Sequence, residues 1–192
     1  LMVEKVVRMT VNPAPILFGF TLGVMIGSFL NVLIYRLPRH QSILWPPSSC
    51  PACRRRLSGC DLVPMISYIW LQGKCRYCQQ PIKFSYLAVE LLTGLFTLAW
   101  VFRFGWVPSE LWRLISGYAL IVIATIDLKT RLIPNRLTYL LFLGGLIYRW
   151  SQGEIIAALL GGGIAGSLML LIYVLYPKGI GMGDLKLLTS LG

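Results

Sequence analysis

The longest uncharged segment of the chain sets the first limit on its fold. No Lys, Arg, Asp or Glu occurs over the 27 residues from Met9 to Tyr35. A helix that crosses a bilayer needs about 20 mostly apolar residues, and this segment exceeds that length. The residues at its end, Tyr35 and Arg36, are not the small residues of a signal-peptide cleavage site. We therefore interpret the segment as a permanent membrane helix.

The composition of the whole chain points to the same class of protein. Of its 192 residues, 56% are hydrophobic and only 13% are charged, with a mean hydropathy of +0.71. A soluble domain carries about 25% charged residues, and a disordered chain has far fewer apolar ones. The five cysteines are too sparse, and odd in number, for a secreted disulfide scaffold. The sequence predicts an all-α polytopic membrane protein.

Further apolar segments follow the first one. With it they predict about six transmembrane helices, the last of them cut off at the end of the chain: 9–35, 84–102, 109–126, 137–153, 155–177 and a run after Asp184. We expect three parts: residues 1–35 with the first helix, a polar segment at 36–83, and a helical membrane domain at 84–192 that is incomplete at its carboxyl end.

The distribution of Lys and Arg predicts the orientation. The segments 36–83, 127–136 and 177–186 hold 13 of the 18 basic residues, and they alternate with segments that hold five. Cytoplasmic loops carry the excess of Lys and Arg. We therefore expect the amino terminus outside the cytoplasm and these three segments inside it. The net charge of +11 is thereby assigned to the membrane surface rather than to nucleic acid.

Four cysteines in the segment 36–83 have the spacing of a zinc site. Cys50 and Cys53 form one CxxC pair, Cys75 and Cys78 form a second, and 21 residues separate the pairs. Four thiolates supply a closed tetrahedral shell for zinc, and metal binding can fold a segment too small to have its own core. The alternatives are reduced cysteines or a disulfide, which a cytoplasmic loop disfavours. Cys60 is interpreted as a spare thiol, and the single histidine, His40, as an ordinary loop residue.

Two aspartates lie at the cytoplasmic ends of apolar segments. Asp127 ends the third predicted span, and Asp184 follows the fifth within Gly181-Met182-Gly183-Asp184. Two neighbouring carboxyl groups, one ionised and one protonated, can activate water and polarise a peptide carbonyl. Gly181 and Gly183 would let the backbone approach an extended substrate. The alternatives are structural: Asp127 caps a helix or pairs with Lys129 or Arg131, and Asp184 caps the next helix.

Taken together, these features resemble the bacterial prepilin peptidases, the type IV leader peptidases. The two CxxC pairs match that family, and Asp127 stands where its first catalytic aspartate is expected. The other matching segments are Gly27-Ser28-Phe29-Leu30-Asn31-Val32, Tyr35-Arg36-Leu37-Pro38, Asp61-Leu62-Val63-Pro64, Pro81-Ile82, Tyr86-Leu87-Ala88-Val89-Glu90-Leu91-Leu92-Thr93-Gly94 and Gly181-Met182-Gly183-Asp184-Leu185-Lys186-Leu187.

The resemblance implies an aspartic endopeptidase of the inner membrane. Such enzymes remove the short basic leader from type IV prepilins and type II secretion pseudopilins at the cytoplasmic face. Many also methylate the new amino terminus with S-adenosylmethionine. By this resemblance Asp127 and Asp184 are the catalytic pair, Gly181, Gly183 and Lys186 support the catalytic loop, and zinc is held by Cys50, Cys53, Cys75 and Cys78.

Some residues depart from the pattern or fit it loosely. Gln79 stands where glycine is common, and Asn135 where aspartate is common. The family usually continues for further spans beyond the GxGD segment. Glu90 is a weak candidate for the methyl-donor site; its structural alternative is a buried carboxylate bonded to a neighbouring helix. Asp61 is interpreted as a turn or cap residue.

Two functions of other classes compete with the peptidase. A transporter with a cysteine-rich cytoplasmic gate would need ionisable groups along a path near the bilayer midplane. Only Glu90 lies well inside a predicted span, and the other acids gather at one face. A membrane-anchored zinc scaffold would leave the two aspartates unexplained.

Overall fold

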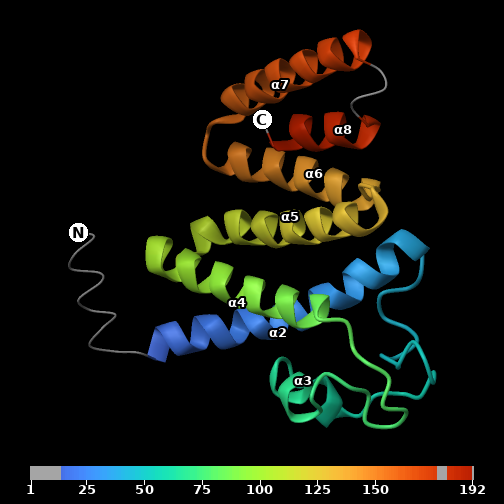
Figure 1. Ribbon diagram of the computed structural model, residues 1–192. Coiled ribbons are helices and arrows are strands. Elements are labelled where there is room, and N and C mark those ends of the chain that lie inside the picture. Colours follow the sequence, from blue (N-terminus) through green and yellow to red (C-terminus); the bar gives the residue numbers. More distant parts are fainter. Residues whose placement is uncertain (1–13, 177–180, 192) are drawn as a thin grey trace. The chain divides into compact units, whose positions relative to one another are not determined.

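The chain folds into helices on either side of one polar segment (Figure 1). The structure is a computed structural model and describes residues 14–176 and 181–191. Six helices of ten or more residues are found there: α2 (Ala14–Arg36), α4 (Ser85–Phe104), α5 (Leu111–Thr130), α6 (Asn135–Ser151), α7 (Ile155–Leu175) and α8 (Met182–Leu191). Shorter helices are η1 (Leu37–Arg39), η2 (Gly59–Leu62), α3 (Ile66–Trp70) and η3 (Pro108–Glu110).

The predicted fold class is confirmed. Within the described ranges no strand is present, and the only β pairing is two isolated bridges, Ser49 with Arg56 and Lys74 with Pro81. Four helical stretches are long and apolar enough to cross a membrane: Ala14–Arg39, Ser85–Phe104, Pro108–Thr130 and Ile155–Leu175. The other two predicted spans are also helical, with 17 residues in α6 and 10 in α8.

One helix boundary differs from the expectation. The third apolar segment was expected to end at Ile126, but α5 continues to Thr130. Asp127, expected at the end of this span, therefore lies within the last turn of α5. The amide of Arg131 still donates to the carbonyl of Asp127, at 2.8 Å, and Arg131 itself is left-handed with φ of 53°.

The chain divides into two compact units, Leu1–Glu110 and Leu111–Gly192. In the first, α2 and α4 pack closely because glycines of one helix face small side chains of the other. A Cβ on Gly27 would come within 2.8 Å of the Glu90 Cα, and a Cβ on Gly23 within 2.7 Å of the Thr93 carbonyl oxygen. Small residues at a helix contact allow backbones this near each other, as is common in membrane helices.

Polar side chains at this contact bond to main-chain groups. Thr93 and Thr97 are completely buried, and their hydroxyls donate to carbonyls of their own helix, at 2.7 Å in each case. Asn31, also buried, donates from Nδ2 to the carbonyl of Tyr86 at 3.0 Å. A polar group satisfied in this way can be buried without the penalty of a missing hydrogen bond.

Arg36 organises the chain as it leaves α2. Its guanidinium is buried and donates to the carbonyls of Ser42, Ile43 and Pro46. These carbonyls belong to an irregular loop that has no regular secondary structure of its own. The planar guanidinium of one side chain thus satisfies three main-chain acceptors and fixes the path of the loop at the start of the polar segment.

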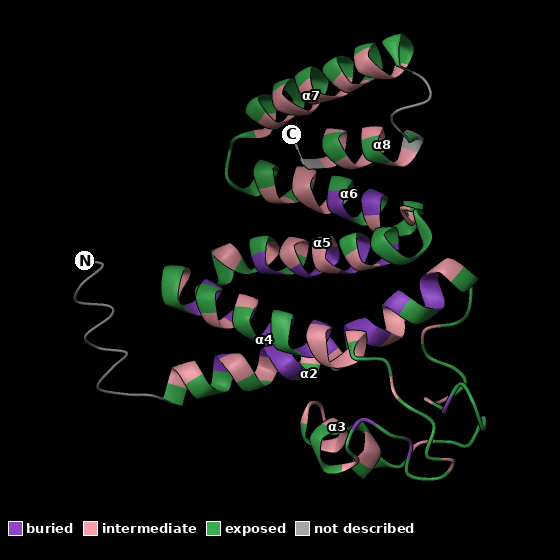
Figure 2. Ribbon diagram, viewed as in Figure 1, coloured by how far each residue is buried: buried purple, intermediate pink, exposed green. Residues whose placement is uncertain are grey.

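The second unit has its own small core. Ala119, Ile123 and Leu141 are buried in it, and five partly buried side chains pack against them: Trp112, Leu120, Ile133, Leu137 and Leu187. The indole of Trp112 occupies the space above Gly144, where a Cβ would collide with the ring. Helix α7 has no buried residue, and exposed and half-buried residues alternate along it (Figure 2). An apolar helix surface of this kind suits a lipid environment.

We expect Gly27→Leu to lower the stability of the first unit, because its side chain would press into the backbone of α4. Overpacking of this kind costs about 1–3 kcal/mol. The measurement is thermal unfolding in detergent, followed by tryptophan fluorescence. Gly163→Leu is the matched control, since Gly163 lies in α7 and a Cβ there meets nothing within 4 Å. An equal midpoint for Gly27→Leu and the control would contradict the close packing.

Candidate active site and four-cysteine cluster

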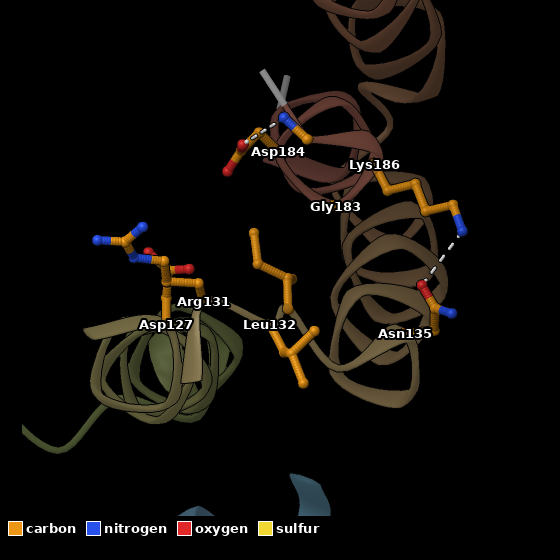
Figure 3. A pocket seen from close by; sticks show the side chains of 9 residues that line it. Asp127, Arg131, Leu132, Asn135, Gly183, Asp184 and Lys186 are labelled. Carbon is orange, nitrogen blue, oxygen red and sulfur yellow. Dashed lines mark hydrogen bonds between the residues drawn. The ribbon is translucent and has the colours of Figure 1, made fainter. Parts of the chain in front are cut away.

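The two aspartates that the sequence predicts to be catalytic, Asp127 and Asp184, line one pocket of the second unit. The pocket has a volume of about 360 Å³ and is formed by the end of α5, the connection to α6 and the start of α8. Its lining residues are Asp127, Arg131, Leu132, Ile133, Asn135, Gly181, Gly183, Asp184 and Lys186. Figure 3 shows Asp127 and Asp184 projecting from different helices, α5 and α8. The two residues are 57 positions apart in the sequence.

Asp184 occupies the third position of α8 and caps that helix. Its Oδ2 accepts a hydrogen bond from the main-chain N–H of Gly181, at 3.1 Å (Figure 3). Acidic side chains are stabilising in a first helical turn because the unpaired N–H groups there carry partial positive charge. The capping role that sequence analysis left open is therefore present. It engages one carboxylate oxygen only, and the side chain remains exposed at the pocket.

The second glycine of the GxGD segment is required by close packing. A Cβ on Gly183 would lie 2.9 Å from the Cβ of Ile133. Any larger residue would push the start of α8 away from the connection between α5 and α6. Since Asp184 directly follows Gly183 and that connection directly follows the end of α5, this contact brings the two aspartate-bearing segments together.

Lys186 and Asn135 form a link that sequence analysis did not foresee. The Lys186 ammonium donates to Oδ1 of Asn135, at 3.2 Å, and so joins α8 to the first residue of α6 (Figure 3). Asn135 was noted only as a departure from the family pattern. The one signal in the sequence was its position directly after Ile133-Pro134, where a helix can begin.

In the first unit, the four predicted zinc ligands come together. The Sγ atoms of Cys50, Cys53, Cys75 and Cys78 all lie within 4.8 Å of one another, and those of Cys50 and Cys78 are 3.9 Å apart. A tetrahedral site with Zn–S bonds of about 2.3 Å places its sulfurs about 3.8 Å apart. The donor set and its spacing therefore fit a metal ion. Cys60 is exposed and is not a member of the cluster.

Each CxxC pair sits in the same kind of turn. The amide of Cys50 donates to the Arg55 carbonyl and the Cys50 carbonyl accepts from Arg54; Cys75 makes the same two bonds, with Gln80 and Gln79. Arg54 and Gln79 both have a left-handed backbone, with φ of 58° and 57°. This conformation favours glycine, which gives a physical reason why glycine is common at the position of Gln79.

Asp61 joins the segment between the two turns to the second turn. Its carboxylate accepts from the amide and hydroxyl of Ser58, at 3.0 and 2.8 Å, and from Nε of Arg76, at 2.7 Å. Desolvation alone would raise the pKa of this carboxyl, but the hydrogen bonds from Ser58 and the charge of Arg76 lower it below its ordinary value. Asp61 is thus a cap residue, as expected, and also one half of an ion pair.

The surroundings of Cys78 change the acidity of its thiol. A hydrogen bond from the Gln80 backbone lowers its pKa, but desolvation and the neighbouring thiols of Cys53, Cys75 and Cys50 outweigh that effect and raise the pKa to about 11. A divalent metal ion binds cysteines as thiolates, so its binding to this cluster would release the thiol protons.

Glu90, the weak candidate for a methyl-donor site, makes structural contacts. Its Oε2 accepts from the main-chain N–H of Met65, at 2.8 Å, and Ser28 and Asn31 of α2 also hydrogen bond to its carboxyl group. The side chain is buried between α2, α4 and the polar segment. These contacts match the structural alternative of a carboxylate bonded to a neighbouring helix.

Two family models match the chain, and together they cover most of it. The bacterial peptidase A24 N-terminal domain matches residues 21–104, and the type IV leader peptidase family matches residues 114–192. The first match contains the four cysteines and Glu90. The second contains Asp127 and Asp184. No solved structure matches the chain.

Curated relatives agree with the family models. A prepilin leader peptidase/N-methyltransferase of Pectobacterium carotovorum subsp. carotovorum is 36% identical over 202 residues, covering 89% of this chain and 71% of the relative. Proteins with the same name from Aeromonas hydrophila and Bacillus subtilis (strain 168) are 34% and 36% identical, with similar coverage. On these matches, the chain is a membrane protein that belongs to the type IV leader peptidase family.

Proposed function

We propose that the chain is a prepilin leader peptidase whose catalytic groups are Asp127 and Asp184. The observation that carries the proposal is that both carboxyl groups line one pocket of the second unit. The family and the names of the relatives support this activity rather than a transporter or a scaffold. The substrates are prepilins or pseudopilins, whose leader precedes a hydrophobic helix.

The chemistry needs two carboxyl groups in different protonation states. The ionised member accepts a proton from water, and the resulting hydroxyl attacks the carbonyl carbon of the scissile peptide bond. The protonated member donates to the carbonyl oxygen, and a proton then passes to the departing amine as the C–N bond breaks. Both proton transfers take place at one scissile bond, so the two carboxyl groups must reach the same substrate, and both line one pocket.

The substrate must also present its leader junction in an extended form. A peptide bond within a helix is shielded by its hydrogen bonds, so the leader junction must be extended before water can attack it. A substrate helix that is already aligned in the bilayer has lost much of its orientational freedom, which favours productive placement of that junction. We place the pocket at the cytoplasmic face, following the excess of Lys and Arg in the segments 127–136 and 177–186.

Gly183 and Lys186 position the two aspartates and do not act on the substrate directly. Gly183 permits the contact of α8 with Ile133, and Lys186 holds α8 to Asn135. We assign Gly181, Gly183 and Lys186 to support of the catalytic loop. Positioning of this kind matters because small displacements of catalytic groups can lower a rate strongly.

We also propose that Cys50, Cys53, Cys75 and Cys78 hold one structural zinc ion. The metal would neutralise the charge of four thiolates and connect the two cysteine turns. The relatives' name includes N-methyltransferase, and we extend that activity, with S-adenosylmethionine as donor, to this chain. Glu90 is assigned to support of the polar segment rather than to the methyl-donor site.

Asp127→Asn and Asp184→Asn should each abolish leader removal, with a loss of at least about a thousandfold in rate. Asparagine keeps the shape of the side chain and, at position 184, an oxygen for the Gly181 N–H. The assay mixes the purified chain with a model prepilin in liposomes and detects the products by mass spectrometry. Glu154→Gln, outside the pocket, is the control. Cleavage by either asparagine variant at the wild-type rate would disprove the assignment.

Asn135→Leu should lower kcat about tenfold through loss of the link to Lys186, with little change in KM. Asn135→Asp should retain activity, because an aspartate accepts the same hydrogen bond and adds a charge opposite to that of the ammonium. Steady-state cleavage kinetics distinguish the two variants. Equal kcat values for Asn135→Leu and wild type would show that the link has no influence on the reaction.

Metal analysis should find one zinc per chain after gentle purification, and Cys75→Ser should lose most of it. Cys60→Ser is the matched control, since Cys60 is exposed and lies outside the cluster. Chelation should also make the two cysteine turns more sensitive to protease, because it removes the metal that would join them. Zinc content that is unchanged in Cys75→Ser, or lost in Cys60→Ser, would refute the site.

A further inference from the structure

Helix α3 presents an apolar face that nothing in its own unit covers. Ile66, Ile69 and Trp70 are 64%, 66% and 82% exposed, and their spacing of three and four residues puts them on one side of the helix. Tyr68 turns the other way, with its hydroxyl donating to the Ile82 carbonyl at 3.4 Å. Figure 2 shows the exposed residues along α3.

The depth of α3 along the membrane helices is set by a hydrogen bond. Met65, which directly precedes α3, donates its N–H to Oε2 of Glu90 at 2.8 Å. Glu90 is five residues into α4, about 7.5 Å along the helix axis. The 20 residues of α4 span about 30 Å, the thickness of the hydrocarbon core. The start of α3 is therefore level with the apolar part of α4 rather than with its end.

The charges around α3 favour an anionic surface. The segment 36–83 holds eight Lys or Arg residues and a single acid, Asp61. Asp61 is paired with Arg76, so it does not offset the remaining basic charge. Basic residues near a bilayer are attracted to anionic headgroups, and tryptophan is enriched where headgroups meet acyl chains.

We propose that α3 is an interfacial helix, whose Ile66, Ile69 and Trp70 enter the acyl region of a leaflet that contains anionic phospholipid. The occupant of this apolar face is the bilayer in which the protein resides. Glu90 anchors the helix at that depth by accepting the Met65 N–H, which would otherwise lack a partner in lipid. The inference does not depend on the peptidase activity.

Trp45 provides a matched control within the same segment. It is 72% exposed, like Trp70, but its loop is bound to Arg36 at the end of α2. Asn31 bonds to Tyr86 near the start of α4, and Arg36 lies five residues beyond Asn31, about 7.5 Å farther out. Trp45 is thus expected outside the hydrocarbon, whereas Trp70 lies within it.

The test is tryptophan quenching by brominated lipid. The full chain is reconstituted in vesicles of equal parts phosphatidylcholine and phosphatidylglycerol, with the acyl chains of the phosphatidylcholine brominated or not. Wild type, Trp70→Phe and Trp45→Phe are compared. The quenching due to each tryptophan is the part of the wild-type bromine quenching that its Phe variant lacks. This part should be at least about twofold larger for Trp70 than for Trp45. Equal quenching of the two, or quenching of Trp70 by aqueous iodide instead, would overturn the proposal. Quenching of Trp70 by neither agent would show a protein cover and would overturn it too.

A second measurement tests the anchor. Glu90→Leu removes the acceptor of the Met65 N–H, whereas Glu90→Gln keeps an oxygen in its place. Bromine quenching of Trp70 should persist in Glu90→Gln and fall by at least about twofold in Glu90→Leu. If quenching is equal in the two variants, Glu90 does not set the depth of α3.

Discussion

The lack of water in a bilayer is the constraint on which the first unit depends. A main-chain or side-chain polar group there must find its partner within the protein. Each of four polar side chains bonds to a main-chain group: Asn31, Glu90, Thr93 and Thr97. Glycines at the contact bring α2 and α4 close together, and the bond from Asn31 to the Tyr86 carbonyl crosses between these two helices. The buried acid and amide in an apolar helix pair are therefore part of how the polar segment is attached, and removing either would leave a partner unsatisfied.

Much of the architecture could be predicted because it is encoded locally. Apolar runs of membrane length specify helices whatever surrounds them, and a CxxC pair needs only a short turn to point two sulfurs the same way. The helix ends were less certain. Ile126 is the last apolar residue of its run, but the hydrogen bonds of α5 continue to Thr130, since helix propensity does not stop where hydropathy does.

What the sequence could not reveal are contacts between distant residues. Lys186 and Asn135 are 51 residues apart and Glu90 and Met65 are 25 apart, so no local pattern pairs them. The aspartates were expected to be close only because both end apolar segments on the same predicted side. That they line one pocket follows from the contact of Gly183 with Ile133, a matter of steric fit between two loops. The cap of α8 engages only Oδ2 of Asp184, so the capping role does not exclude the proposed catalytic role.

The matching turns around the cysteines carry a consequence for the origin of the segment. Ser49–Arg56 and Lys74–Pro81 repeat the same bridge, the same pair of hydrogen bonds and the same left-handed residue, at a constant offset along the chain. Two copies of one eight-residue hairpin, each supplying two sulfurs, are sufficient to provide four ligands for a tetrahedral ion. Such a site can arise by duplication of a single hairpin, each copy contributing half of the ligands, with later sequence drift erasing everything except the cysteines and the shape of the turn.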